Sequence, residues 1–281
     1  ETGIGTAQWI GMIGGVLVFL WMLLTPSPDG LSLAGWRTAA VALLMAIWWV
    51  TEVIPIFATA LMPIVLFPIL GITTIDETTM PYADPMIYLF LGGFIIAIAM
   101  QRWDLHRRIA LNIISVIGSK PRSIILGFLI ATAFMSMWVS NTAATMMMLP
   151  IALSVIQLTK QIEFDEKDRL QYRNFALVLM LGIAYAANVG GLGTIIGTPT
   201  NALMIAFVND AYGIEISFAK WITIGLPVVI LGVPVIFYVL SSIVYPVRIK
   251  TLPGGKEYIQ DELKRLGKIS KPEMMVAVTF V

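Results

Sequence analysis

Two polar interruptions of long apolar runs hold the residues best suited to bind a ligand. The apolar stretch 123–158 is interrupted by Ser-Asn-Thr at 140–142, and 174–208 is interrupted by Gly-Gly-Leu-Gly at 190–193 and by Gly-Thr-Pro-Thr-Asn at 197–201. Serine, threonine or asparagine before a helix, and proline in its first turn, are typical of helix starts. A helix N-terminus attracts anions, and unwound carbonyls nearby suit a cation. The sequence therefore places candidate sites for a small anion and a cation at these interruptions.

Ionisable side chains are almost absent from the apolar runs, with Glu52 near the end of one run as the main exception. Because no buried carboxylate or histidine is available as a proton relay, sodium suits the cation role better than a proton. A hydrolase with Ser140 as its nucleophile would need a histidine or lysine base, which the runs lack. Two helix N-termini supply about one positive charge, so a dianion would require bound cations or further segments. Spacing alone also allows 140–142 to be a capped turn between two ordinary spans.

The composition is that of a membrane protein. Of 281 residues, 58% are hydrophobic and 12% are charged, whereas soluble domains carry about a quarter charged residues. A net charge of +1 argues against nucleic-acid binding, which would want a basic face or stripe. The absence of cysteine and the presence of a single histidine, His106, exclude disulfides, thiolate chemistry and His-rich metal sites.

Lysine and arginine concentrate in three stretches: 102–122, 160–173 and 248–271. Cytoplasmic loops accumulate these residues, so the stretch 123–158 begins and ends on the same side. Each of its arms has about 16 or 17 residues and reaches only roughly 25 Å, which is less than the hydrocarbon thickness of about 30 Å. We therefore predict a re-entrant hairpin with 140–142 at its tip. The stretch 174–208 is predicted to be a broken transmembrane helix.

The remaining apolar runs are each predicted to cross the membrane once: 8–24, 38–51, 56–71, 86–101 and 221–246. Beyond them, apolar residues recur at helical spacing among lysine and glutamate: Ile259, Leu263, Leu266 and Ile269. This pattern indicates an amphipathic helix on the cytoplasmic surface. A further apolar run begins near Met274, so we expect the natural chain to continue into another span.

Four stretches together resemble one family, the divalent anion/sodium symporters, also described as INDY-type dicarboxylate transporters. They are WWVTEVIP at 48–55 with TALMP at 59–63, LFLGGFIIAIAMQRWDLHRRIAL at 89–111, SMWVSNT at 136–142, and GTPTN at 197–201. The resemblance covers nearly the whole chain. It implies an all-α polytopic membrane protein, an inverted-repeat elevator transporter with a re-entrant hairpin and a broken transmembrane helix. The chain would hold the first repeat and the beginning of the second.

The resemblance also implies roles for individual residues. It implies one sodium site, lined by Ser136, Ser140, Asn141 and Gly197. It implies half of a substrate site, formed by Asn141, Thr142, Thr198 and Pro199. Family members carry Ser-Pro-Pro-Asn or Thr-Gly-Pro-Asn where this chain has Thr-Pro-Thr-Asn at 198–201, so individual substrate contacts are not carried over. No catalytic residue is expected, because the implied function is not enzymatic.

The function implied is sodium-coupled uptake of four-carbon dicarboxylates (succinate, malate or fumarate) by a homodimer in the bacterial inner (plasma) membrane. Residues 1–119 would hold scaffold helices and the entry to the first repeat, and 120–210 the moving transport-domain part. Residues 211–281 would add a scaffold helix, the amphipathic helix and the start of the second repeat. Alternatives are a citrate or tricarboxylate carrier, a sulfate symporter, a dicarboxylate exchanger and a sodium/proton antiporter. A membrane scaffold without transport is a further alternative, although it would make no use of polar loops at membrane depth.

Overall fold

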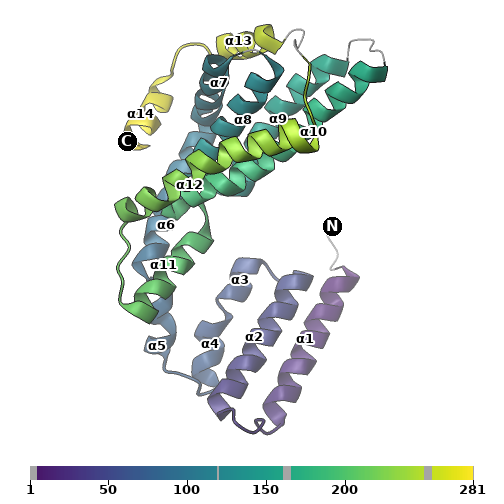
Figure 1. Ribbon diagram of the computed structural model, residues 1–281. Helices are drawn as coiled ribbons and strands as arrows, with labels where there is room; N and C mark the ends of the chain where they lie inside the picture. The colour runs from purple at the N-terminus through teal and green to yellow at the C-terminus, as the bar shows by residue number, and fades with distance from the viewer. Residues whose placement is uncertain (1–4, 119, 161–165, 250–254, 281) are drawn as a thin grey trace. The chain divides into compact units, whose positions relative to one another are not determined.

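The structure, a computed structural model, describes residues 5–118, 120–160, 166–249 and 255–280 (Figure 1). The described residues form helices joined by turns and contain no β-strand, which confirms the predicted all-α class. The basic stretch predicted at 160–173 lies partly outside these residues. The chain divides into two compact units, residues 1–88 and 89–281.

Among the described residues, five helical segments are long and apolar enough to cross a bilayer: Thr6–Leu24, Leu33–Thr51, Ile75–Arg102, Arg169–Gly193 and Phe218–Val244. They contain 19 to 28 residues each, and about 20 helical residues suffice to span the hydrocarbon core. The polytopic membrane class predicted from composition is therefore confirmed.

In the first unit, α1 (Thr6–Leu24) and α2 (Leu33–Thr51) form an antiparallel pair (Figure 1). Glycines on α1 allow the two helices to come close, since a Cβ added at Gly11 would lie 2.0 Å from Thr51 Oγ1. Helix α2 ends at Thr51, and the next residue, Glu52, is exposed and has a left-handed backbone conformation with φ of 48°. Its carbonyl accepts a hydrogen bond of 2.9 Å from Gln8 Nε2. Glu52 thus marks the end of its helix, as predicted.

The single crossing predicted at 56–71 is not one helix. The structure has two short helices, α3 (Ile56–Ala60) and α4 (Met62–Ile69), which meet at Leu61. Pro63 explains the break, because proline has no N–H to donate to the carbonyl four residues earlier and favours the first turn of a new helix. Together the two helices are shorter than the five candidate spans. They lead to α5 (Ile75–Thr79) and then to α6 (Pro85–Arg102).

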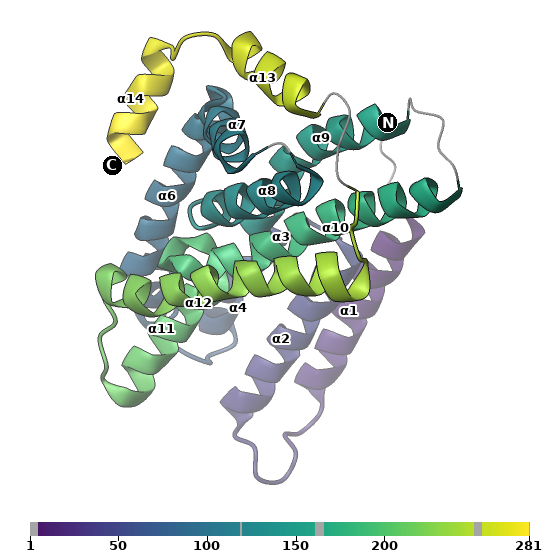
Figure 2. The same ribbon diagram turned by 45° about the horizontal axis from the view of Figure 1, so that its top comes forward.

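The second unit is built around α8 (Pro121–Ser136), which is buried on nearly every face. Figures 1 and 2 show α7 (Leu105–Ile117) and α10 (Glu166–Gly190) beside it. The core includes fully buried side chains from all three helices: Leu111, Ile114, Phe128, Leu129, Phe175 and Leu179. Apolar residues line the whole circumference of α8 rather than one stripe, as expected for a helix buried inside a unit.

The remaining helices cover this core. Helix α9 (Asn141–Lys160) packs beside α10, and α12 (Phe218–Tyr238) crosses both α8 and α10. The predicted amphipathic helix is α13 (Gly255–Leu266), followed by α14 (Lys271–Phe280).

The apolar face of α13 contacts the core of the second unit. Ile259 is buried in that core, and Leu263 and Leu266 pack against it. Ile269 does not extend this face, so that part of the prediction is wrong: the helix ends at Leu266, and Gly267 reverses the chain with a φ of +61°.

Candidate functional site

The hairpin tip is the turn between α8 and α9. Helix α8 ends at Ser136 and α9 begins at Asn141. Ser140 precedes α9, and its Oγ accepts a hydrogen bond of 3.4 Å from the N–H of Ala143, as an N-cap does. The helix–turn–helix predicted around 140–142 is therefore present.

The break in the second apolar stretch also lies where the sequence predicts it. Helix α10 ends at Gly190, two 3₁₀ turns follow at Gly191–Gly193 and Ile195–Gly197, and α11 begins at Pro199 and runs to Tyr212 (Pro199–Tyr212). Thr198 is the residue before α11 and has an extended backbone, but its side chain makes no capping hydrogen bond. The predicted helix start is thus confirmed, whereas the capping role of the threonine hydroxyl is not seen.

Asn201 and Thr194 hold the broken segment together. The amide nitrogen of Asn201 donates to the carbonyls of Gly191 and Thr194, each at 2.8 Å. The hydroxyl of Thr194 accepts from the N–H of Gly197 at 3.1 Å and donates to the carbonyl of Met137 in the hairpin turn. Two buried side chains therefore satisfy backbone groups that the break leaves without helical partners.

The glycines of the break are required by close packing against the hairpin tip. A Cβ added at Gly190 would lie 2.3 Å from the carbonyl oxygen of Ala133, and one at Gly191 would lie 2.3 Å from Asn141 Oδ1. A Cβ at Gly197 would lie 2.9 Å from the carbonyl oxygen of Ser136. Gly190 keeps a right-handed helical backbone with φ of −58°. The glycines thus end α10 without the left-handed termination that a glycine pair usually indicates.

A cluster of oxygen atoms lies where the tip meets α10. The hydroxyl of Ser136 lies 2.8 Å from Asn141 Oδ1 and 2.7 Å from the carbonyl oxygen of Ala187. A serine hydroxyl has one proton, so it can donate fully to only one of these two acceptors. Asn141 Nδ2 donates to Asn188 Oδ1 at 3.1 Å. The cluster therefore has an excess of acceptor oxygens over donated protons, an arrangement that suits a bound cation.

The structure brings together three of the four residues predicted to line a sodium site, because Ser136, Asn141 and the backbone of Gly197 all meet at this junction. Ser140 is half-buried and caps α9. Of the residues predicted to face a substrate, Thr142 is exposed in the first turn of α9.

Thr198 and Pro199 begin α11, with Thr198 half-buried and Pro199 exposed. The hydroxyl of Thr198 lies 3.3 Å from that of Thr200. Both helix starts thus have side chains on accessible surface, Thr142 on α9 and Pro199 and Thr200 on α11.

Sequence reasoning missed Asn188, Thr194 and the carbonyl of Ala187. Asn188 is a polar residue in the last turn of an apolar helix, two positions before the glycine pair, and this position was the available signal. Asn201 belongs to the predicted pentapeptide at 197–201, although the sequence did not show that it would fasten the break. The residues of the cluster carry no ionised side chain, so its electrostatics rest on dipoles of hydroxyl, amide and peptide groups.

Comparison with known proteins places these motifs in a family. Residues 6–281 match the family model described as the sodium:sulfate symporter transmembrane region. A sodium-dependent dicarboxylate transporter, SdcS, from Staphylococcus saprophyticus is 43% identical over 274 residues, which cover 98% of this chain and 53% of the relative. SdcS from Staphylococcus aureus strain MRSA252 is 44% identical over 276 residues, with the same coverage of 98% and 53%.

This chain therefore spans about half the length of the curated relatives that it matches. The relatives are named as transporters, which agrees with the candidate membrane spans and with the expectation that the chain is not an enzyme. The match over almost every residue, together with the hairpin tip and the helix break, shows that the chain belongs to the sodium:sulfate symporter family.

Proposed function

We propose that this chain takes part in the sodium-coupled uptake of four-carbon dicarboxylates such as succinate, malate and fumarate. The names of its relatives, sodium-dependent dicarboxylate transporters, support this class of substrate. The observation that carries the proposal is the oxygen cluster at the hairpin tip. There, the Ser136 hydroxyl lies near two acceptors and has one proton to share between them.

A sodium ion in this cluster would remove the mismatch between acceptors and protons. Hard cations are bound by neutral and anionic oxygens of this kind, including backbone carbonyls and amide side chains. Ser136, Asn141 and the backbone near Gly197 would hold the ion, and Ser140 would complete its surroundings. The ion is a co-transported substrate, so its binding would be reversible.

The dicarboxylate would bind at the starts of α9 and α11. Each start supplies about half a positive charge through the helix dipole, and Asn141, Thr142, Thr198 and Pro199 lie there. These two termini neutralise about one of the two negative charges of a dicarboxylate. The sodium ion beside Asn141 would supply further positive charge, so that anion binding would depend on sodium.

We propose further that α8 and α9 form a re-entrant hairpin. Helix α8 has 16 residues and reaches about 24 Å at 1.5 Å per residue, which is less than a hydrocarbon core of about 30 Å. In this proposal the protein is a homodimer that works by an elevator motion, with scaffold residues in 1–119, a moving part in 120–210, and a scaffold helix and the start of a second repeat in 211–281.

Uptake into cells or proteoliposomes containing the full-length protein tests the function. Labelled succinate should accumulate with an inward sodium gradient, and a pH gradient alone should not drive it. Sulfate is the second candidate substrate, because the description of the family model refers to sulfate. If the protein takes up sulfate but not succinate, sulfate would replace dicarboxylates as the proposed substrate. If protons drive uptake in the absence of sodium, the proposed sodium coupling would be overturned.

A further inference from the structure

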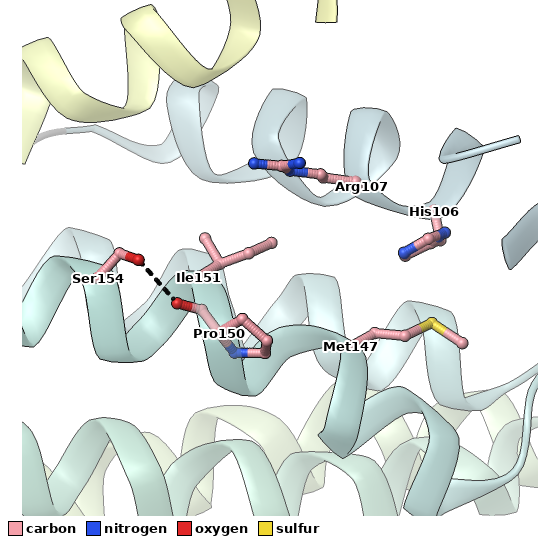
Figure 3. Close-up of a pocket in the computed structure, with 6 residues that line it drawn as sticks. All are labelled: His106, Arg107, Met147, Pro150, Ile151 and Ser154. Atoms are coloured by element: carbon pink, nitrogen blue, oxygen red, sulfur yellow. Dashed lines mark hydrogen bonds between the residues drawn. The ribbon is translucent and has the colours of Figure 1, made fainter. Parts of the chain in front are cut away.

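A cavity of about 310 Å³ lies between α7 and α9, on residues that the proposed transport function does not use (Figure 3). It is lined by His106, Arg107, Met147, Pro150, Ile151 and Ser154. Figure 3 shows His106 and Arg107 on α7 facing the other four residues across the cavity. Its volume lies at the lower end of the range of about 300 to 1,000 Å³ that is typical of small-molecule sites.

The lining combines hydrogen-bonding groups with an apolar floor. His106 and Arg107 contribute an imidazole and a guanidinium from α7, and Ser154 contributes a hydroxyl from α9. Nδ1 of His106 lies 3.2 Å from the carbonyl oxygen of Met100, which leaves Nε2 for another partner. The hydroxyl of Ser154 contacts only its own helix in the hydrogen bonds seen, at 3.0 Å from the carbonyl oxygen of Pro150, so it can rotate toward a ligand.

Within the described part of the chain, the guanidinium of Arg107 has a donor that lacks an acceptor. Its Nη2 pairs with Glu262 on α13, but its Nε is buried and has no hydrogen-bond partner among the described residues. Leaving a buried donor of a charged group without a partner is costly, so such atoms usually indicate a missing acceptor.

The charges around Arg107 also favour an anion. Glu262 is shared with a second guanidinium, because Arg265 Nη1 lies 3.1 Å from its Oε1. Two guanidinium groups therefore share one carboxylate, and the cluster formed by Arg107, Glu262 and Arg265 keeps one net positive charge. The neighbouring pair of Arg108 and Glu273 is balanced and does not alter this sum.

We propose that this cavity binds a phosphate group that carries a short apolar substituent. A guanidinium, an imidazole and a hydroxyl placed on two facing helices match a tetrahedral anion with several acceptor oxygens. Met147, Pro150 and Ile151 provide contact for the apolar part. The phosphate comes either from a free phosphate compound or from the headgroup of an anionic phospholipid. Bound there, it joins α7 to the second arm of the hairpin.

Two probes on the full-length protein distinguish the sources. In detergent, inorganic phosphate should raise the midpoint of thermal unfolding of the wild type if free phosphate binds. After purification from membranes, native mass spectrometry should detect retained phosphatidylglycerol if a lipid headgroup binds. Both probes are applied to His106→Leu, which removes a donor, and to Ser154→Phe, which fills the cavity without breaking a contact between helices.

In both variants, the apparent affinity for phosphate or the occupancy by phosphatidylglycerol should fall about tenfold or more, as expected when a hydrogen bond to a charged group is lost. Arg102→Gln is the matched control, because Arg102 is exposed and lies before α7, outside the cavity lining. The single variant Asn141→Ala should bind phosphate or phosphatidylglycerol as the wild type does, because the hairpin tip is not part of this cavity. The proposal is overturned if neither probe binds, or if binding is equal in wild type, His106→Leu and Ser154→Phe.

Discussion

Asn188 Oδ1 accepts a hydrogen bond of 3.1 Å from Asn141 Nδ2, and so connects the last turn of α10 to the first residue of α9. The contact fixes which end of the Asn141 amide faces Ser136. With Nδ2 engaged by Asn188, Oδ1 is directed to the Ser136 hydroxyl at 2.8 Å. An exposed asparagine outside the family motif thereby orients the amide oxygen proposed to bind sodium.

Replacing Asn188 by alanine should weaken sodium binding without removing any proposed ligand of the ion. Loss of a hydrogen bond of this kind costs about 1 kcal/mol, so the sodium concentration that gives half-maximal uptake should rise about fivefold. The measurement is succinate uptake as a function of sodium concentration. Asn112→Ala is the control, because Asn112 is an exposed asparagine whose side chain bonds to its own helix. Equal sodium dependence in the two variants would show that Asn188 does not orient Asn141.

A methyl group at Gly191 should disturb the same amide sterically. Its Cβ would lie 2.3 Å from Asn141 Oδ1, closer than non-bonded atoms come. We expect Gly191→Ala to abolish sodium-dependent uptake or to reduce it more than tenfold. Gly92→Ala is the matched control, since a Cβ at Gly92 meets nothing within 4 Å, and alanine stabilises a helix relative to glycine by up to about 1 kcal/mol. Uptake by Gly191→Ala at the level of Gly92→Ala would contradict the packing described here.

Thr142 provides a test of the substrate site. Its side chain is exposed in the first turn of α9, where a hydroxyl can donate to a carboxylate. Thr142→Ala should raise the KM for succinate about tenfold or more, the effect of losing one hydrogen bond to a charged group, while protein abundance stays unchanged. Thr223→Ala removes a hydroxyl that bonds only within α12 and should leave the KM unaltered. An unchanged KM in Thr142→Ala would remove Thr142 from the site.

Arg108 should be important for stability rather than for transport. Its Nε lies 2.9 Å from Glu273 Oε1, and its terminal nitrogens donate to the carbonyls of Leu266 and Gly267 at the end of α13. Arg108→Gln would leave the nearly buried Glu273 carboxylate without its charged partner, which costs about 3 kcal/mol or more. Chemical denaturation of the full-length protein should detect this loss, and Arg102→Gln should cause almost none.

The same pair gives a pH dependence. The hydrogen bonds from Arg108 lower the pKa of Glu273 below its usual value, despite the opposing effect of burial. A carboxylate whose pKa is lowered by folding stabilises the fold above its unfolded pKa of about 4.3, and this contribution disappears as pH falls through the folded pKa. The difference in stability between wild type and Arg108→Gln should therefore shrink below about pH 4. A difference that stays constant from neutral pH to acid would contradict the role of this pair.

Cysteine labelling tests the re-entrant hairpin, and the described chain offers exposed positions at both ends of it, Lys120 and Gln157. Residues 1–281 contain no cysteine, so each cysteine introduced here is the single labelling site within them. Cysteines placed at 120 and at 157 should both react with a membrane-impermeant maleimide from the cytoplasmic side. Labelling from opposite sides would show that the apolar stretch crosses the membrane an odd number of times.

Sequence patterns predicted the positions of the two polar turns well because both depend on local chemistry. Polar residues before a helix, proline in its first turn and glycine pairs act within a few residues, and the hairpin tip and the start of α11 lie where these signals occur. Apolar length predicted α1, α6 and α12 for the same reason. The break between α3 and α4 at Leu61 was missed because the sequence stays hydrophobic across it. The position of Pro63 is the only local signal of this break.

The remaining details of the site depend on contacts between distant residues. Asn188 and Asn141 are 47 positions apart, and Met137 and Thr194 are 57 apart, so no local pattern reveals that they meet. Likewise, the Gly-Gly-Leu-Gly motif indicates a helix end but not that Ala133 and Asn141 occupy the space in front of it. The partners become visible only when α8 and α10 are packed together.

The burial of α8 has a consequence for how the hairpin tip can move. Helix α8 is enclosed by α7 and α10. A Cβ added at Gly127 of α8 would lie 3.0 Å from Ile114 Cα of α7, and one added at Gly182 of α10 would lie 2.6 Å from Leu129 Cδ1 of α8. Sliding α8 by one turn, about 5.4 Å, would separate these matched surfaces and expose fully buried side chains. Any displacement of the tip must therefore carry the helices packed against α8 with it. The moving part of the proposal would then begin at α7 rather than at residue 120, and it would be a block of helices rather than a flexible loop.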